Sequence, residues 1–257
     1  KIGESPRWMR QRLQAVGIRS INNVVDAANY VLMETGHPLH TFDLRYIEGG
    51  KIVVRKAVDK EKITTLDGKE RELDDSVLLI CDGKKPVAVA GIMGGENSEV
   101  KDDTTDLLLE SAYFDAIVVR RGAKKLQLAT DASHRFERGT DPNGIAYALD
   151  RLASLIVELA GGEITQGQVD AYPSVIEPLE VTFRAQRCNA ILGTEIETTT
   201  ISKILNGLEL FHTENGGVFK VKVPTFRPDI TREIDLVEEV GRIFGYNNIP
   251  VPQHFSI

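Results

Sequence analysis

The stretch SVLLICDGKKPVAVAGIMGG, residues 76–95, contains two short apolar runs separated by polar residues. Both runs are rich in β-branched or small apolar residues, which is typical of short buried strands. Asp82-Gly83 lies between them, and an Asp-Gly pair favours a tight turn. The stretch therefore predicts two strands joined by a tight turn.

Similar β-rich runs lie on both sides of this pair. They are KIVVRKA at 51–57, KITTL at 62–66 and DLLLESAYF at 106–114, and Asp67-Gly68 marks a second tight turn. Because these runs are close together in the sequence, residues 51–115 predict a central β-sheet.

Helical patterns flank this sheet region. SPRWMRQRLQAVGI, residues 5–18, predicts a helix with Ser5 as N-cap and a stop at Gly17, and residues 21–36 predict a second helix that ends at Gly36. DPNGIAYALDRLASLIVELAGG predicts a third helix, and EITQGQVDAY, residues 163–172, predicts a further strand. We expect an α+β fold, with residues 1–173 forming one mixed α/β domain.

A proline-flanked stretch, AYPSVIEPLE, predicts a linker to a smaller domain at residues 174–257. This domain combines two predicted strands with three predicted helices, and we interpret it as winged-helix-like. The expected helix caps are Thr198 or Thr199 for the second helix and Asp229 for the third. The expected apolar stripe of the third helix is Ile230, Ile234, Val237, Val240 and Phe244.

The bulk properties exclude several classes of protein. No apolar run is long enough for a membrane span, and the formal net charge of −7 argues against a surface that binds nucleic acid everywhere, although it allows a local basic patch. The two cysteines, far apart in the sequence, favour free thiols in a reducing compartment over a disulfide framework. The start KIGESPRW has neither an initiator Met nor a signal segment, so we expect a piece of a longer cytoplasmic protein.

Five stretches contain residue choices that a hydrophobic core does not require. They are NNVVDAANYVLMETGHPLHTFD (22–43), AVAGIMGGENSEV (88–100), LLLESAYFD (107–115), LATDASHRFERGTDP (128–142) and RPDITREIDLVEEVGRIFGYNNIP (227–250). Together and in this order, the chain resembles the β subunit of bacterial phenylalanyl-tRNA synthetase. The resemblance covers the editing module of that subunit and the small module that follows it.

The resemblance implies hydrolytic proofreading, the cleavage of tyrosine wrongly attached to tRNA(Phe). It implies tRNA(Phe) and the α subunit as partners, in an α2β2 heterotetramer that uses ATP and Mg²⁺ for aminoacylation in the intact enzyme. No cofactor is expected in this part of the subunit. The alternative from another class is a non-catalytic module that binds RNA or another subunit.

His37 and His40 straddle Pro38, a spacing that raises the question of a metal site. A catalytic zinc site needs three protein ligands, and no Cys-x-x-Cys or His-Glu-x-x-His motif supplies more, so we predict no metal site. HPLH is instead interpreted as a rigid turn. The resemblance places His40 in the editing pocket with Pro38 beside it, and it gives His37 no role.

From sequence alone, Glu110 is a glutamate at the surface end of a strand. The resemblance instead implies that it accepts a hydrogen bond from the tyrosine hydroxyl. Gly91 and Gly94 belong to a glycine-rich turn that lacks the lysine of a phosphate-binding loop. The resemblance places both in the same pocket, where a side chain would fill the space.

The resemblance also assigns Thr130 and Ala132 to the pocket wall and Asn29 to the ester chemistry beside His40. Ala28 stands where many members of the family have threonine, so the resemblance does not carry a role of that threonine hydroxyl over to this chain. The candidate tRNA-binding residues are Arg120, Arg121, Lys124, Lys125, Arg135 and Arg138. A basic cluster of this kind can bind phosphates or can be a solvated face, and the sequence leaves both open.

Overall fold

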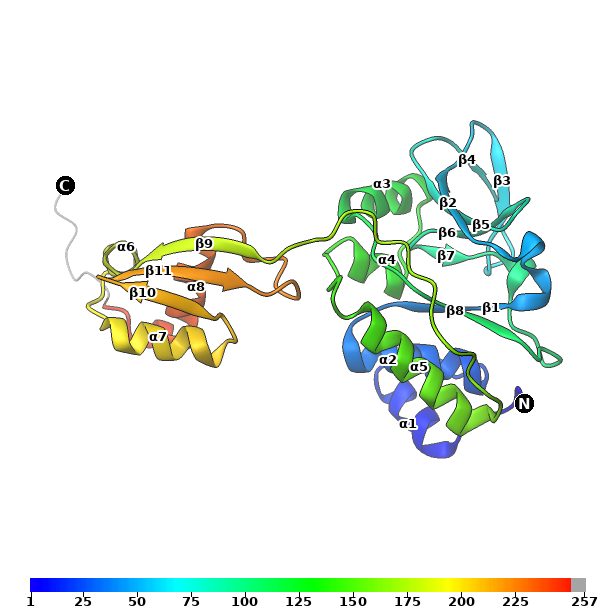
Figure 1. The fold of residues 1–257 in the computed structure, drawn as a ribbon, viewed down its shortest axis with the longest axis horizontal. Coiled ribbons are helices and arrows are strands. Elements are labelled where there is room, and N and C mark those ends of the chain that lie inside the picture. The colour runs from blue at the N-terminus through cyan, green and yellow to red at the C-terminus, as the bar shows by residue number, and fades with distance from the viewer. Residues whose placement is uncertain (251–257) are drawn as a thin grey trace. The chain divides into compact units, whose positions relative to one another are not determined.

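The computed structural model describes residues 1–250, so the last seven residues of the predicted small domain, 251–257, lie outside the described part. The chain divides into an N-terminal unit, Lys1–Asp170, and a C-terminal unit, Ala171–Ile257. Both units combine helices with antiparallel strands (Figure 1), which confirms the predicted α+β class.

Three helices of the N-terminal unit pack around one apolar core. They are α1 (Arg7–Ala15), α2 (Asn23–Thr35) and α5 (Ile145–Ala160), and their shared core includes Met9, Val31 and Leu152. Gly36 ends α2 in the left-handed conformation, with φ +74°, as predicted. Two further helices, α3 (Ala116–Leu126) and α4 (Asp131–Phe136), lie over the strands.

The strands of this unit form three antiparallel sheets, so the prediction of one central sheet was wrong. The largest has the order β2-β5-β6-β7, and the others are β1-β8 and the hairpin β3-β4. The bounds are β1 Leu39–Asp43, β2 Val53–Lys56, β3 Glu61–Thr64, β4 Glu70–Leu73, β5 Leu78–Cys81, β6 Pro86–Val89, β7 Met93–Gly94 and β8 Leu107–Ser111.

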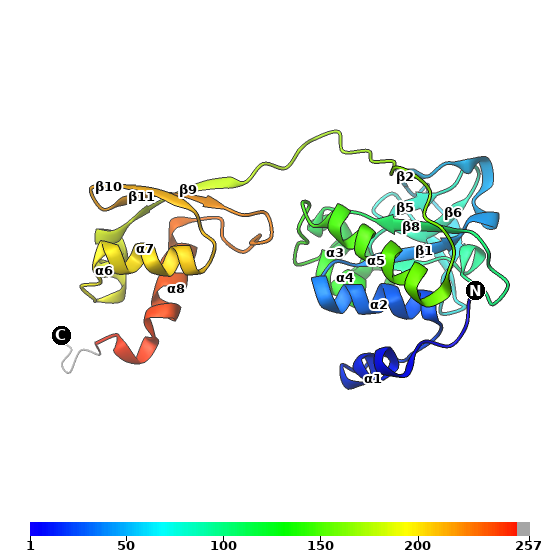
Figure 2. The ribbon, with the colours of Figure 1, turned by 60° about the horizontal axis from the view of Figure 1, so that its bottom comes forward.

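The two-stranded ribbon β1-β8 lies between two hydrophobic cores. Leu39 and Leu109 pack with the helical core, whereas Phe42 and Leu108 pack with the core of the other strands. Figures 1 and 2 both show the ribbon between α2 and the remaining strands. Since side chains alternate along a strand, even-numbered residues of β1 and β8 face the strand side.

The C-terminal unit contains a three-stranded antiparallel sheet in the order β10-β11-β9, one strand more than predicted. The strands are β9 (Leu179–Arg184), β10 (His212–Asn215) and β11 (Val218–Val223), and the helices are α6 (Ala185–Leu192), α7 (Thr198–Gly207) and α8 (Glu233–Phe244). Phe183, Phe219, Leu205 and Val240 lie in their common core. The winged-helix-like interpretation stays a prediction.

The strand predicted at residues 163–172 does not form. The whole stretch is exposed and has neither helical nor strand conformation. Alternating polarity alone does not make a strand, because a strand also needs a partner for its backbone hydrogen bonds.

Three predicted helix caps were wrong because their side chains bind elsewhere or lie inside the helix. Ser5 donates its hydroxyl to the buried carboxylate of Asp26, and α1 begins after Pro6. Asp229 pairs with Arg227 at 2.6 Å instead of capping α8. For α7, Thr198 is already helical, so neither it nor Thr199 is the cap.

The predicted apolar stripe of α8 was wrong at two positions. Ile230 is buried in the same core but precedes the helix. Ile234 is 43% exposed, and Leu236 is buried in its place beside Val237 and Val240. Within residues 1–250, no helix has both the length and the apolar content that a membrane span requires.

Candidate functional site

His40 and Glu110 lie directly opposite each other in the β1-β8 ribbon. Directly paired residues on antiparallel strands have side chains on the same face, with Cβ atoms roughly 4.5–5.5 Å apart. The resemblance selected both residues separately, and the strand register places them opposite each other. Their shared face is the one on which Phe42 and Leu108 pack with the strand core.

Burial shifts the pKa values of the two side chains in opposite senses. It lowers the pKa of His40 to about 4 and raises the pKa of Glu110 to about 7. At neutral pH the imidazole is therefore uncharged, and the carboxyl group holds its proton more readily than an exposed glutamate does. Its Oε2 atom is buried and has no hydrogen-bond partner. A buried acceptor without a partner is costly, which makes it a candidate ligand-binding atom.

Gly94 provides the space that the His40 ring occupies. A Cβ atom at position 94 would lie 2.6 Å from Cε1 and 2.7 Å from Nε2 of His40. On another side, the ring of Phe42 contacts the imidazole edge-on, with centroids 4.5 Å apart. The imidazole is thus fixed between a glycine and an aromatic ring.

The interpretation of HPLH as a turn was wrong for its second half. The turn ends at the buried Pro38, and Leu39 and His40 already belong to β1. His40 is therefore held by a backbone ladder as well as by its packing.

His37 lies in a separate environment. It is 3% exposed, packs edge-on against Phe136 of α4, and burial lowers its pKa. Among residues 1–250, no group of three or more His, Cys, Asp or Glu side chains is arranged to hold a metal ion.

Gly91 has a packing reason to be glycine. Its φ is +67°, and a Cβ atom there would lie 2.9 Å from Phe114, 3.1 Å from Phe136 and 3.1 Å from Val119. The missing side chain of Gly91 thus faces the core of the strand region, whereas that of Gly94 faces His40.

Thr130 and Ala132 lie at the start of α4. The Thr130 hydroxyl donates to the Ile92 carbonyl at 2.8 Å and accepts from the Ser133 amide at 3.0 Å, so it both caps α4 and ties it to the glycine-rich turn. Ala132 is half-buried against the strand core.

Asn29 lies half-buried on α2 beside the buried Ala28. Met33 lies one turn later on the same side of the helix. Its sulfur accepts a hydrogen bond from Arg135 Nη2 of α4 at 3.2 Å. Within the part of the chain that the structure describes, the Asn29 amide has no hydrogen bond in the protein. The side of α2 that bears Asn29 therefore faces α4, and the Asn29 amide on it is free to bind a ligand.

The six candidate tRNA-binding cations fall into two sets. Lys125 pairs with Asp74, Arg135 with Asp131 and Arg138 with Glu137, at 2.7, 3.0 and 2.6 Å. The other three are exposed on α3 and have no ion pair among residues 1–250; they are Arg120, Arg121 and Lys124.

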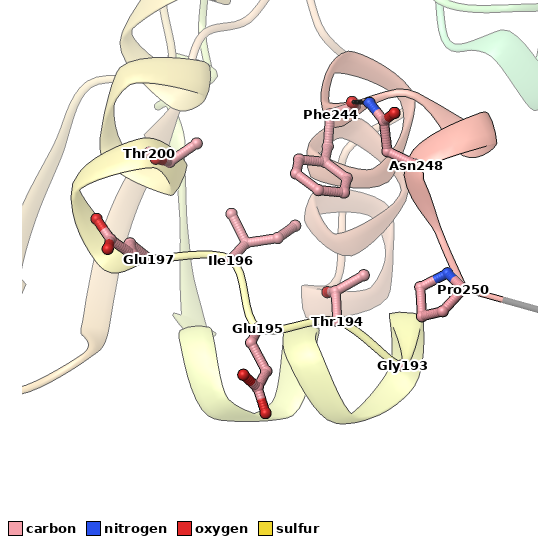
Figure 3. A pocket seen from close by; sticks show the side chains of 9 residues that line it. All are labelled: Gly193, Thr194, Glu195, Ile196, Glu197, Thr200, Phe244, Asn248 and Pro250. Carbon is pink, nitrogen blue, oxygen red and sulfur yellow. Dashed lines mark hydrogen bonds between the residues drawn. The ribbon is translucent and has the colours of Figure 1, made fainter.

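A pocket of about 570 Å³ in the C-terminal unit was not predicted. It lies between the α6–α7 loop and the end of α8 (Figure 3). Its lining includes Glu195 and Glu197 but no Lys or Arg side chain, so it does not suit phosphate binding. No sequence motif marks it, because its walls come together only when α6, α7 and α8 pack.

Comparisons with known proteins agree with the division into two units. Residues 1–161 match the B3/4 domain, and residues 181–246 match the tRNA synthetase B5 domain. The phenylalanine–tRNA ligase β subunit of Syntrophus aciditrophicus is 54% identical over 97% of the chain and 32% of its own length. That of Geobacter metallireducens is 55% identical over 97% of the chain and 31% of its own length.

The chain thus spans about a third of the length of these curated relatives. A solved N-terminal fragment of the phenylalanyl-tRNA synthetase β subunit from Pyrococcus horikoshii is 16% identical, with a TM-score of 0.43 over 95% of this chain and 70% of that one.

Proposed function

The chain belongs to the B3/4 domain family, and from this membership we propose that its N-terminal unit is a proofreading esterase within a phenylalanine–tRNA ligase β subunit. The proposed reaction is hydrolysis of the ester that links tyrosine to tRNA(Phe). The supporting observation is the buried Oε2 of Glu110, which has no partner and lies opposite His40.

Glu110 would recognise the hydroxyl that distinguishes tyrosine from phenylalanine. The tyrosine O–H can donate to the free Oε2 atom, whereas phenylalanine would leave that atom buried and unpaired. A site built to bind a hydroxyl rejects the analogue that lacks it, because its polar group loses its partner. The selection therefore favours the mischarged product over the correct one.

His40 would orient groups at the ester without acting as a strong base. A pKa of about 4 leaves the imidazole neutral at pH 7, and such a weak base takes a proton from water inefficiently. It can still donate one hydrogen bond and accept another. We assign to it the positioning of the attacking water, assisted by the Asn29 amide and the substrate's own ribose hydroxyl.

The other pocket residues would shape this site. Gly94 would leave room for the imidazole, and Thr130 would hold α4 against the glycine-rich turn. The small side chain of Ala132 would leave space for the aminoacyl ester. Pro38 would restrict the backbone that leads into β1 and His40. Gly91 would allow the positive φ at the start of the glycine-rich turn.

The C-terminal unit would support RNA or subunit binding. It matches the B5 domain. We propose that β9, α6, α7, β10 and β11 form a winged-helix-like fold. In the intact enzyme we expect an α2β2 heterotetramer in the cytoplasm. ATP and Mg²⁺ would be bound for aminoacylation outside this chain, as the resemblance implies.

A purely binding module is the second candidate. The observation that favours it is the set of three unpaired cations on α3, which suits phosphate contacts without any chemistry. The two candidates differ in whether the ester is cleaved.

The test is single-turnover deacylation of Tyr-tRNA(Phe) and Phe-tRNA(Phe) by the complete β subunit assembled with its α subunit. Glu110→Ala should lower the ratio of the two rates by about 10- to 150-fold, the worth of a hydrogen bond to a charged group. Glu110→Gln should fall between, because an amide oxygen still accepts a hydrogen bond.

The matched control is Glu72→Ala, which removes an exposed glutamate from β4 and should leave both rates unchanged. If Glu110→Ala lowers both rates equally, Glu110 does not recognise the hydroxyl. If the wild type cleaves neither ester, the binding-module candidate replaces the esterase.

A further inference from the structure

The outer surface of α1 carries a cluster of aromatic and cationic side chains. The rings of Trp8 and Tyr30 meet edge-on with centroids 5.4 Å apart. The Arg12 guanidinium lies 5.4 Å from the Trp8 centroid and 6.0 Å from that of Tyr30, and it donates to the Tyr30 hydroxyl at 2.6 Å. The three side chains thus hold one another in a fixed arrangement.

This cluster is not needed to bury α1. The helix packs through Met9 and Leu13, which are 0% and 1% exposed, whereas Trp8 is 39% exposed and Arg12 is also exposed. Figure 2 shows α1 as the outermost element of this side of the N-terminal unit, with α2 between it and the strands. Trp8 is also the only tryptophan of the chain.

The surroundings of the cluster are basic, in a chain whose net charge is −7. The first 19 residues contain five cations, Lys1, Arg7, Arg10, Arg12 and Arg19, but only one acidic residue, Glu4. Glu4 pairs with Arg10. Arg7, Arg12 and Arg19 are exposed and have no carboxylate partner among residues 1–250.

The same unit has another site where cations contact an aromatic ring, and the charge of its arginine differs from that of Arg12. Tyr46 lies 5.4 Å from the Lys101 Nζ atom and 5.6 Å from the Arg45 guanidinium. Arg45 is neutralised by Asp43 at 2.6 Å and Asp103 at 3.0 Å. The charge at Arg12 is therefore available to a ligand, and that at Arg45 is not.

We propose that the Trp8–Arg12–Tyr30 surface binds unpaired nucleotides of an RNA strand. An exposed aromatic ring offers a stacking platform to any base, and adjacent arginines contact the phosphates. The RNA identity of the ligand rests on the proposed function, although the surface itself does not depend on ester hydrolysis.

The position of Tyr30 links this surface to the candidate site. Tyr30 follows Asn29 directly on α2, and both are half-buried. A strand stacked on Trp8 and passing Tyr30 would reach the side of α2 that bears the free Asn29 amide. The surface would thus hold the nucleotides next to the esterified one.

The experiment uses the tryptophan as its own reporter. The 257-residue chain is titrated with a single-stranded RNA hexamer ending in CCA, and fluorescence is followed. We expect saturable quenching that weakens as salt increases. With a labelled hexamer, Trp8→Ala should weaken binding by about 5- to 150-fold, whereas Trp8→Phe should retain most of the affinity. Arg12→Gln should reduce the salt slope by about 0.7.

Tyr46→Ala is the matched control and should leave hexamer affinity unchanged. Retained affinity in Trp8→Ala, no quenching in the wild type, or equal affinity for a hairpin without unpaired nucleotides would each overturn the proposal. Quenching by the α subunit and not by RNA would assign the surface to a protein partner and would also overturn it. The hexamer carries no aminoacyl ester, so its binding is measured independently of hydrolysis, and failure of the esterase and failure of this surface are separable.

Discussion

The paired residues His40 and Glu110 should make opposite contributions to stability as pH changes. The pKa of Glu110 rises from 4.5 to about 7 on folding, so the folded state holds the extra proton and stability falls as pH rises through that interval. The pKa of His40 falls from 6.5 to about 4, so the unfolded state holds the extra proton and stability rises with pH. Over most of this range the two contributions cancel.

Single substitutions should reveal each contribution. Relative to the wild type, Glu110→Gln should gain stability as pH rises from about 4.5 to 7, by up to about 3 kcal/mol, because the pH dependence of His40 is no longer offset. His40→Gln should show the reverse trend. Urea denaturation of the chain at several pH values measures both free energies of unfolding.

The double variant His40→Gln/Glu110→Gln is the control, and its pH dependence should follow that of the wild type. Parallel pH profiles for the wild type and both single variants would contradict the assignment of these two pKa shifts.

At the scale of single elements, α3 carries the basic residues that are free to meet phosphates. Arg121→Gln and Lys124→Gln should each reduce the slope of log affinity for tRNA(Phe) against log salt by about 0.7–0.9. Lys125→Gln should reduce it less, because Lys125 is neutralised by Asp74 at 2.7 Å. Filter binding over a range of salt concentrations compares the three variants on one helix.

An equal change in slope for all three variants would mean that the Asp74 pair opens on binding. Unchanged slopes would make α3 a solvated face.

The strand β1 shows what local sequence patterns could and could not predict. The helix before it was predicted to its last turn, because the apolar period and Gly36 are local signals. β1 itself was missed, since Pro38 suggested a turn and its partner β8 begins far along the chain, at Leu107. The position of His40 opposite Glu110 depends on that pairing, so only the resemblance could select both residues.

The missed helix caps have a similar cause. A serine, threonine or aspartate before a helix predicts a cap only if no other partner takes its side chain. Asp26 is such a partner, because its buried carboxylate also accepts from the Ser20 hydroxyl and, at 2.8 Å, from the Ile21 amide. Long-range contacts of this kind cannot be deduced from neighbouring residues.

On the scale of the whole molecule, the connection between the two units is a long accessible stretch of the described residues. Residues 161–175 are all exposed and contain no helix or strand. A glutamate-specific protease should therefore cut first at Glu163, releasing two folded fragments, because cleavage needs an extended and accessible backbone. Mass spectrometry of early digestion products identifies the sites.

The exposed Glu99 and Glu209, which lie within the two units, provide the comparison. Earlier cleavage at either of them would show that the units open more readily than their connection.

Each unit also encloses one free thiol, Cys81 in the first and Cys188 in the second, 2% and 0% exposed. Burial raises the pKa of both thiols, that of Cys188 to about 11, so neither is nucleophilic in the folded chain. Alkylation can then occur only during transient opening, and peptide mapping separates the two adducts. The alkylation rate of each cysteine thus measures how often its own unit opens, independently of the other unit.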